Sequence, residues 1–163
     1  MFRLAPETKD DWWEVENLYD LSFAPGREAL SSYRLREGVD PISALCLVAR
    51  DDLGVLSGVI RYWPIVIGED KAETLLLGPI AVHPTCQGEG LGNLLMHQSL
   101  GAARALGWKR VLLVGDAPYY GRFGFQKNTN LDYPQPVNPE RVLTLELSDG
   151  AFDGVSGVVA KAS

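Results

Sequence analysis

Three apolar runs in the middle of the chain have the length and composition of strands, and a short polar turn separates each from the next. The runs are Ala44–Arg50, Val55–Ile67 and Thr74–Val82. The turns between them, Asp51–Gly54 and Gly68–Lys71, have the composition of hairpin connections. Because hairpin turns join antiparallel neighbours, the three strands are predicted to be antiparallel.

After the third strand the apolar pattern changes to a helical period. Leucine and alanine residues mark one face of a helix from Leu91 to Leu106, and Gly107 follows as the expected C′ residue. The next apolar run, Arg110–Val114, is a short strand. A strand, a helix and a strand in this order predict a right-handed parallel crossover, so the sheet is expected to be mixed.

Shorter elements are predicted on either side of this centre. Thr8 is a predicted N-cap for a helix that continues to about Leu21, and Asp116 is a predicted N-cap for a second, short helix. The remaining predicted elements are a strand at Phe2–Leu4, a polar helix at Arg27–Glu37, the short helix Ala117–Phe123, a loop at Asn128–Glu140, a strand at Val142–Leu147 and one weak strand within Gly150–Ala160. The class is therefore α+β, with a mixed central sheet flanked by helices.

Length and composition narrow the kind of protein. The 163 residues fit one domain spanning residues 1–163, and a hydrophobic content of 46% is enough for a substantial core. The net charge of −6 argues against nucleic acid or an anionic membrane as a partner, because both need clustered Lys and Arg. No signal-peptide layout and no apolar run near the roughly 18 residues of a bilayer crossing is present, so a cytoplasmic location is expected. Two His and two Cys residues cannot furnish a closed zinc site, and no metal is expected.

The segment Leu75–Gly92, which reads LLLGPIAVHPTCQGEGLG, holds the clearest candidate chemistry. An apolar strand delivers a glycine-rich loop to the beginning of a helix, where main-chain N–H groups bind anions. No Lys follows the glycines as in a Walker loop, and their spacing differs from the dinucleotide fingerprint. A turn that merely connects strand to helix is the alternative that the loop alone leaves open.

Two motifs resemble those of a known family. Gln87-x-x-Gly90-x-Gly92, after Val82-His83-Pro84, resembles the acyl-CoA pyrophosphate loop of the GNAT superfamily of N-acyltransferases. The segment Tyr120–Phe125 resembles the Y-x-x-x-G-F ending of the same family. Together with Leu77–Val82 and Val114-Gly115-Asp116, the motifs look in particular like those of the YhbS-like bacterial acetyltransferases. The resemblance implies the GNAT fold, with the parallel strand pair at the cofactor site.

The resemblance also implies acetyl-CoA as co-substrate and a set of residues that bind it. Gly90 and Gly92 allow positive φ and close approach of a phosphate. The implied cofactor-binding residues are Ile80, Ala81 and Val82 on the strand, whose main chain would pair with pantetheine, and Gln87, Gly88, Glu89, Gly90, Leu91 and Gly92 in the loop, which would hold the pyrophosphate.

Tyr120 takes the position of the family's tyrosine and is the implied catalytic residue. A thiol has a pKa near 8.5 and a tyrosine a pKa near 10, so a phenol can protonate a departing thiolate. Tyr119 is the fallback for this role. The general base stays open between Glu73, His83 and the acidic segment Glu28–Glu37. Many family members carry Asn where this chain has Gly115-Asp116, so the role of those two residues is unassigned.

The resulting hypothesis is transfer of an acetyl group from acetyl-CoA to an amine by direct attack in a ternary complex. The alternative is an acyl-CoA-binding sensor of the same fold that catalyses little. The acceptor, a small molecule or a protein amine, is expected to lie between residues 23–37 and the loop after Phe125. The acidic composition favours a polyamine, a protein amine or an antibiotic-like amine over an acidic acceptor. Similar proteins often dimerise, so a homodimer is compatible with the sequence.

Overall fold

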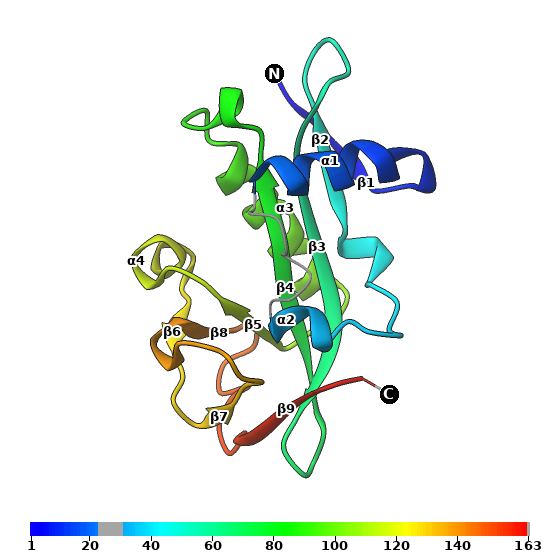
Figure 1. Ribbon diagram of the computed structural model, residues 1–163. Coiled ribbons are helices and arrows are strands. Elements are labelled where there is room, and N and C mark those ends of the chain that lie inside the picture. Colours follow the sequence, from blue (N-terminus) through cyan, green and yellow to red (C-terminus); the bar gives the residue numbers. More distant parts are fainter. Residues whose placement is uncertain (23–30, 163) are drawn as a thin grey trace.

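The computed structural model describes residues 1–22 and 31–162 of the chain (Figure 1). Its strands form a mixed sheet in the order β1-β2-β3-β4-β5-β8-β6. A further strand, β9, pairs with β3 and with the short β7. The bounds are β1 Arg3–Pro6, β2 Leu47–Arg50, β3 Leu56–Ile67, β4 Ala72–Val82, β5 Arg110–Val114, β6 Gln126–Lys127, β7 Leu131–Asp132, β8 Val142–Glu146 and β9 Gly157–Lys161.

The central topology confirms the sequence prediction. The strands β2, β3 and β4 are antiparallel neighbours, and β4 pairs with β5 in parallel. The helix α3 (Leu91–Ala105) connects β4 to β5, and Gly107 follows its end with a φ of +91°. Only a glycine adopts such a φ without strain, which is why the helix ends there.

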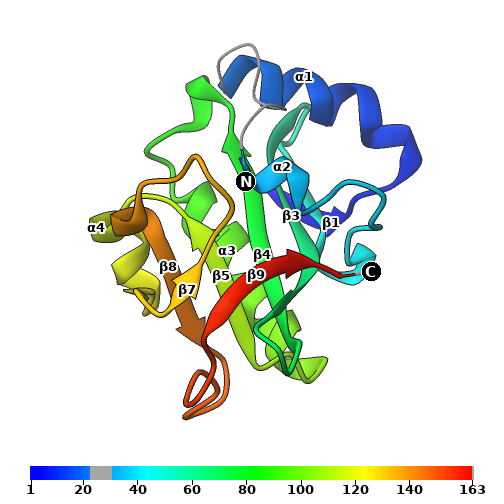
Figure 2. The same cartoon turned by 60° about the horizontal axis from the view of Figure 1, so that its bottom comes forward.

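Helices cover both faces of the sheet. Figure 1 shows α1 (Trp12–Ser22) and α2 (Ser31–Arg34) in front of the strands and α3 behind them, and Figure 2 shows the same layers from below. Side chains alternate between the faces of each strand, as the pleat requires. Tyr62 and Leu75 pack in the cluster that contains Leu95 of α3, whereas Val59 packs in the cluster that contains Val15 of α1.

Small residues bring α3 close to the sheet. A Cβ atom on Gly58 of β3 would lie 3.0 Å from side-chain atoms of both Leu91 and Leu95. The buried hydroxyls of Tyr62 and Ser99 are 2.7 Å apart, and Ser99 also donates to the carbonyl of Leu95 at 2.7 Å. This close seating fixes the beginning of α3 relative to the end of β4.

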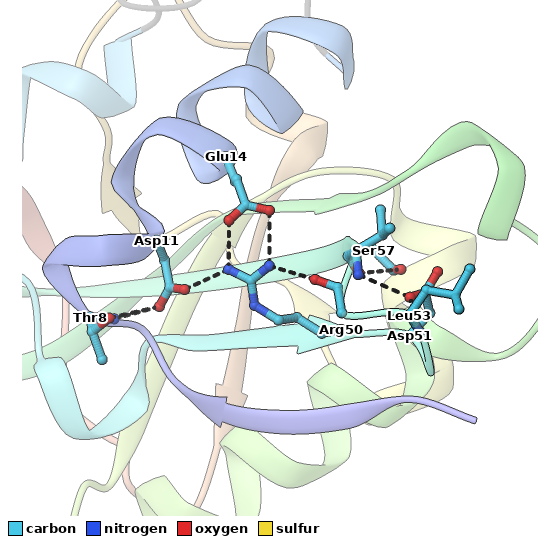
Figure 3. Close-up of polar contacts among 9 residues, drawn as sticks. Thr8, Asp11, Glu14, Arg50, Asp51, Leu53 and Ser57 are labelled. Carbon is cyan, nitrogen blue, oxygen red and sulfur yellow. Dashed lines mark hydrogen bonds and ion pairs between the residues drawn. The ribbon is translucent and has the colours of Figure 1, made fainter.

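A charged cluster joins the beginning of α1 to β2 (Figure 3). Arg50 donates to both carboxylate oxygens of Glu14 at 2.9 Å and to Asp11 at 2.6 Å. Asp11 in turn accepts from the main chain of Thr8 at 2.7 Å. Burial raises the pKa of Asp11, but the hydrogen bonds from Thr8 and Arg50 outweigh this effect and hold it below its ordinary value. The predicted N-terminus of this helix is therefore confirmed, with a 3-10 turn at Lys9–Asp11 before α1.

Two segments differ from the sequence prediction. Of the polar helix expected at Arg27–Glu37, residues 27–30 lie outside the described residues, and the remainder is helical only over Ser31–Arg34. The loop expected at Asn128–Glu140 contains β7 and leads into a 3-10 turn at Pro139–Arg141. Tyr133, with 2% of its surface exposed, anchors this proline-rich segment in the core, which its loop-like composition does not reveal.

The weak strand expected near the C-terminus is confirmed as β9, which lies on β3 over Ile65–Ile67. The short helix after β5 is confirmed as α4 (Ala117–Tyr120), followed by a 3-10 turn at Gly121–Phe123. Asp116 caps α4 by accepting from the amide of Tyr119 at 3.1 Å. None of the helices in the described part of the chain has the length and apolarity that a bilayer crossing requires.

Candidate active site

The site forms where β4 and β5 separate. Their parallel pairing covers Leu75 with Val111 and Leu76 with Leu112. Beyond this point β4 continues to Val82 along β3, while β5 leads away to α4, as Figure 1 shows. Within the described residues no strand pairs with that other edge of β4 after Leu76, so its main-chain groups face the opening between the strands.

A bulge marks the point of separation. Ile60 of β3 opposes Ile80 of β4 and Tyr62 opposes Leu77, so two residues of β4, Gly78 and Pro79, oppose a single residue of β3. Such bulges re-aim a strand and are frequent beside active sites. The fully buried Tyr19 of α1 donates its hydroxyl to the carbonyl of Pro79 at 2.8 Å. This hydrogen bond therefore ties the bulged part of β4 to α1.

A cavity of about 520 Å³ opens between the separated strands. Ile80 of β4 and Tyr120 of α4 lie in its wall. The wall is completed by residues from four parts of the chain: Ser32, Tyr33 and Arg36; Leu77, Gly78 and Pro79; Leu113, Val114, Gly115, Asp116 and Tyr119; and Arg141. We call this space the large cavity. Part of its wall comes from the two segments where the acceptor is expected, residues 32–36 and the segment after Phe125, and an acceptor role for this cavity stays a prediction.

A second cavity of about 460 Å³ lies around the glycine-rich loop. Its lining comprises Val82, Cys86, Gln87, Gly88, Gly90, Leu91, Gly92, Asn93, Tyr119 and Arg122. We call this space the loop cavity. Tyr119 lines both cavities, and β4 contributes Ile80 to one and Val82 to the other. The two spaces therefore adjoin along β4 and together form one elongated site.

The loop has the backbone conformation of an anion site. Gly88 has a φ of +88° and Gly90, the N-cap of α3, a φ of +78°. No side chain among the described residues caps this helix end. Its first amides and the positive end of the helix dipole are therefore available to an anion. The expectation of positive φ is confirmed for Gly90.

The same expectation is wrong for Gly92, which lies in the first turn of α3 without a positive φ. Glycine is needed there for a different reason. A Cβ atom at this position would lie 2.9 Å from the hydroxyl oxygen of Tyr119. The absent side chain lets the tyrosine lie over the helix N-terminus.

Most of the residues implied by the resemblance lie around the two cavities, but some contribute only main chain or lie apart. Leu91 is 1% exposed, so its side chain belongs to the core and only its amide can face the loop cavity. Ala81 points into the core under α1, and the exposed Glu89 lines neither cavity. Roles in cofactor binding stay predictions for all of these residues, and the structure supports those of Ala81 and Glu89 least.

Tyr120 packs edge-to-face against its aromatic neighbours beside the large cavity. Its ring lies over Gly115, where a Cβ atom would be 2.5 Å from the ring carbon Cε2. Its centroid is 4.9 Å from that of Tyr119 and 6.1 Å from that of Phe125. Burial, followed by the neighbouring Tyr119, raises the pKa of Tyr120 to about 12. The phenol therefore stays protonated at neutral pH, and Gly115 is explained by the space that the ring needs.

Of the candidate general bases, Glu73 and His83 are not brought to Tyr120. In the acidic segment, Glu37 does not line the large cavity, and Glu28 lies outside the described residues. Glu73 lies at the beginning of β4 and lines a separate hollow with Lys71 and Lys109. The Nδ1 atom of His83 accepts from the amide of Thr85 at 3.2 Å, a structural role in the turn before the loop. Within the described residues the large cavity has one carboxylate in its wall, Asp116, which already caps α4.

Three arginines at the site were missed by the sequence reasoning. Arg122 lines the loop cavity, lies 4.5 Å above the ring of Tyr119 and donates to Asn93 at 3.2 Å. Arg36 and Arg141 line the large cavity. Arg122 stands inside the Tyr120–Phe125 motif, so a search for a cation beside the motif tyrosine would have found it. No local pattern distinguishes the other two from surface arginines.

The family can now be stated from comparison with known proteins. The acetyltransferase (GNAT) domain matches residues 43–127, more than half of the chain. The chain belongs to this family, and its fold is the GNAT fold, as the sequence motifs predicted.

Among its relatives is the uncharacterized N-acetyltransferase YhbS of Escherichia coli K12. It is 30% identical over 147 residues, which cover 89% of this chain and 87% of the relative. The crystal structure of Escherichia coli YhbS in complex with CoA is 27% identical, with a TM-score of 0.85 and coverage of 99% of this chain and 89% of that one. A GNAT acetyltransferase from Brucella melitensis in complex with acetyl-CoA is 28% identical, with a TM-score of 0.74 and coverage of 100% and 97%.

Proposed function

We propose that this protein transfers an acetyl group from acetyl-CoA to an amine by direct attack within a ternary complex. The carrying observation is the adjoining pair of cavities. One offers an anion site at a helix N-terminus, and the other holds a partly buried, protonated tyrosine. The relatives from Escherichia coli and Brucella melitensis, solved with CoA and acetyl-CoA, support the same ligand here.

The residues present fit acetyl-CoA as a substrate. The diphosphate is expected at the amides around Gly88 and Gly90, with the guanidinium of Arg122 as the adjacent cation. The unpaired edge of β4 from Leu77 to Val82 offers main-chain groups to the two amides of pantetheine. This placement directs the thioester from the loop cavity toward the large cavity and Tyr120.

Acetyl-CoA supplies an activated acyl carbon, which the neutral amine attacks while the carbon–sulfur bond breaks and the thiolate leaves. Tyr120 holds the proton that the thiolate needs, because its raised pKa keeps the phenol neutral. Positioned proton transfer of this kind contributes a factor of about 10²–10⁴. Tyr119 lies nearer the loop, over Gly92, and is assigned to binding.

The test is the pair Tyr120→Phe and Tyr119→Phe, assayed by release of free thiol from acetyl-CoA with a panel of amines. Tyr120→Phe is expected to lower kcat by about 10²-fold or more with acetyl-CoA affinity retained. Tyr119→Phe is expected to change the KM for acetyl-CoA with little effect on kcat. An unchanged kcat in Tyr120→Phe would remove the assigned role. Calorimetric binding of acetyl-CoA without thiol release over the whole panel would favour the sensor instead.

A further inference from the structure

Arg36 is an unusual side chain in the wall of the large cavity. Its guanidinium carbon lies 4.2 Å from the centroid of the Tyr33 ring and 5.8 Å from that of Trp63. Its Nε atom is buried and has no hydrogen-bond partner among the described residues. A buried guanidinium N–H without a partner is costly, and such groups need an explanation.

Two other partly buried arginines, Arg50 and Arg61, are paired with carboxylates. Arg50 contacts Asp11 and Glu14, and Arg61 contacts Glu7 at 2.7 Å and Glu16 at 3.1 Å. Arg36 forms no ion pair with any carboxylate in the described part of the chain. Desolvation lowers its pKa, and the nearby groups that oppose this shift are tyrosines. Among the described residues, therefore, no anion compensates this desolvated cation beside the cavity.

Arg141 adds a second positive charge to the same cavity. It lies in the cavity wall, in the turn before β8, with an exposed side chain, and its charge lowers the pKa of Tyr120 against the dominant effect of burial. Asp116 opposes them, but its carboxylate caps α4. Within the described lining, two arginines and one carboxylate leave the cavity positive, although the whole chain has a net charge of −6.

We propose that the acceptor is a small amine that also carries an anionic oxygen group, a carboxylate or a phosphate, which pairs with Arg36 and Arg141 while the amine faces Tyr120. This proposal rests on the acetyltransferase function proposed above and names its acceptor class. The planar guanidinium suits two-pronged contact with an oxyanion, and Arg36 lines the cavity without a carboxylate partner among the described residues. A volume of about 520 Å³ is in the range of small-molecule sites. The local charge thus reverses the preference for a cationic acceptor that net charge alone suggested.

The first experiment compares acceptors that differ only in the anionic group, using the unmodified protein. One arm pairs β-alanine with β-alaninamide, and the other pairs O-phosphoethanolamine with ethanolamine. Thiol release gives the KM, and calorimetry gives the affinity of each amine for the CoA-loaded protein. The anionic member of at least one pair is expected to bind roughly tenfold or more tightly than its neutral partner, since a hydrogen bond to a charged group is worth this much. The favoured arm distinguishes carboxylate from phosphate.

The second experiment removes the cation. Arg36→Gln is expected to raise the KM of the anionic acceptor roughly tenfold while the KM values of the neutral partner and of acetyl-CoA stay unchanged. Arg34→Gln is the matched control, because Arg34 lies two residues away, is exposed and donates to the carbonyl of Gln135 at 2.7 Å. Arg36→Lys, which keeps the positive charge, is expected to recover part of the preference for the anionic over the neutral acceptor. If Arg34→Gln raises the KM of the anionic acceptor equally, the preference comes from the overall surface charge and not from Arg36. The proposal is then overturned.

The two proposals fail in different ways. If neutral amines are acetylated and bound as well as their anionic partners, the acceptor class is wrong and the acetyltransferase function stands. If no amine releases thiol but the anionic members bind the CoA-loaded protein selectively, the site is right and the catalytic proposal fails. If neither member of any pair binds, the acceptor proposal is overturned. The acceptor pairs need no variant, so a folding defect in Arg36→Gln leaves the test intact.

Discussion

The loop cavity and the large cavity adjoin but are built differently. Around the loop, one continuous segment from Val82 to Asn93 provides most of the lining, and its useful groups are main-chain amides at a helix end. Around the large cavity, four segments spread from Ser32 to Arg141 each contribute side chains. Main-chain groups are the same whichever residue is present, so they suit the part of a ligand that never varies. Side chains can be replaced one residue at a time, so they suit the part that varies. The binding of the donor and the choice of acceptor are therefore separable by mutation.

The largest effect is expected from Gly115→Ala, which disturbs only the large cavity. The new methyl group would lie 2.5 Å from the ring of Tyr120, so the tyrosine must move. We expect kcat to fall by about 10²-fold, toward the value of Tyr120→Phe, with the affinity for acetyl-CoA unchanged. Steady-state kinetics and calorimetry measure the two quantities.

Gly121→Ala is the control for this variant. Gly121 follows Tyr120 directly, has an ordinary helical φ of −57° and offers open space to a methyl group. Its activity is expected to remain that of the unmodified protein. A fall in acetyl-CoA affinity in Gly115→Ala would show that the two cavities are coupled through α4.

The next effect is expected from Gly90→Ala, which disturbs only the loop cavity. A left-handed φ of +78° costs a residue with a Cβ about 1–2 kcal/mol, so binding of acetyl-CoA is expected to weaken by roughly tenfold. The kcat at saturation should hardly change. Gly101→Ala, in open space later in α3, is the matched control and is expected to raise the thermal stability. Equal KM values in both variants would remove the loop from the binding site.

A smaller effect is expected from Arg122→Gln. Arg122 is exposed, so its attraction for the diphosphate is screened by water and salt. We expect the KM for acetyl-CoA to rise about threefold to fivefold at low ionic strength, and the difference to shrink as salt is added. Arg104→Gln, at the C-terminal end of α3 and far from the loop cavity at its N-terminus, should have no effect. A difference that does not depend on salt would contradict an electrostatic role.

The same contrast explains how much could be predicted from sequence. The loop segment contains its own signal, because the glycines, the strand before them and the helix after them are contiguous. The antiparallel strands β2 to β4, the parallel crossover through α3 and the short helix α4 followed from similar local patterns, whereas Tyr120 was singled out by the family resemblance. Arg36 and Arg141 carry no such signal, since 105 positions separate them and only the fold brings them to one cavity. Net charge averages over the whole surface, so it does not report the charge of a single cavity.

Gly92 and Tyr133 show the limit at single positions. From the sequence, Gly92 was expected to need a positive φ. Glycine is needed there instead because the hydroxyl of Tyr119, on α4, lies against this position. Tyr133 lies in a segment whose prolines and asparagines indicate a loop, yet it is buried in the core. Both outcomes depend on contacts between residues far apart in the chain, which composition and periodicity do not record.

The smallest change is expected in the pH dependence of kcat/KM. This profile distinguishes titration of the acceptor amine from titration of Tyr120. Burial raises the pKa of Tyr120 to about 12, so the phenol remains protonated throughout the range in which an alkylamine acceptor, with a pKa near 10.4, loses its proton. The kcat/KM for the acceptor is therefore expected to rise with pH and to show no alkaline fall below about pH 11. A fall that begins near pH 10, absent in Tyr120→Phe, would mean that Tyr120 titrates as an exposed phenol, and the buried acid in the large cavity would have to be abandoned.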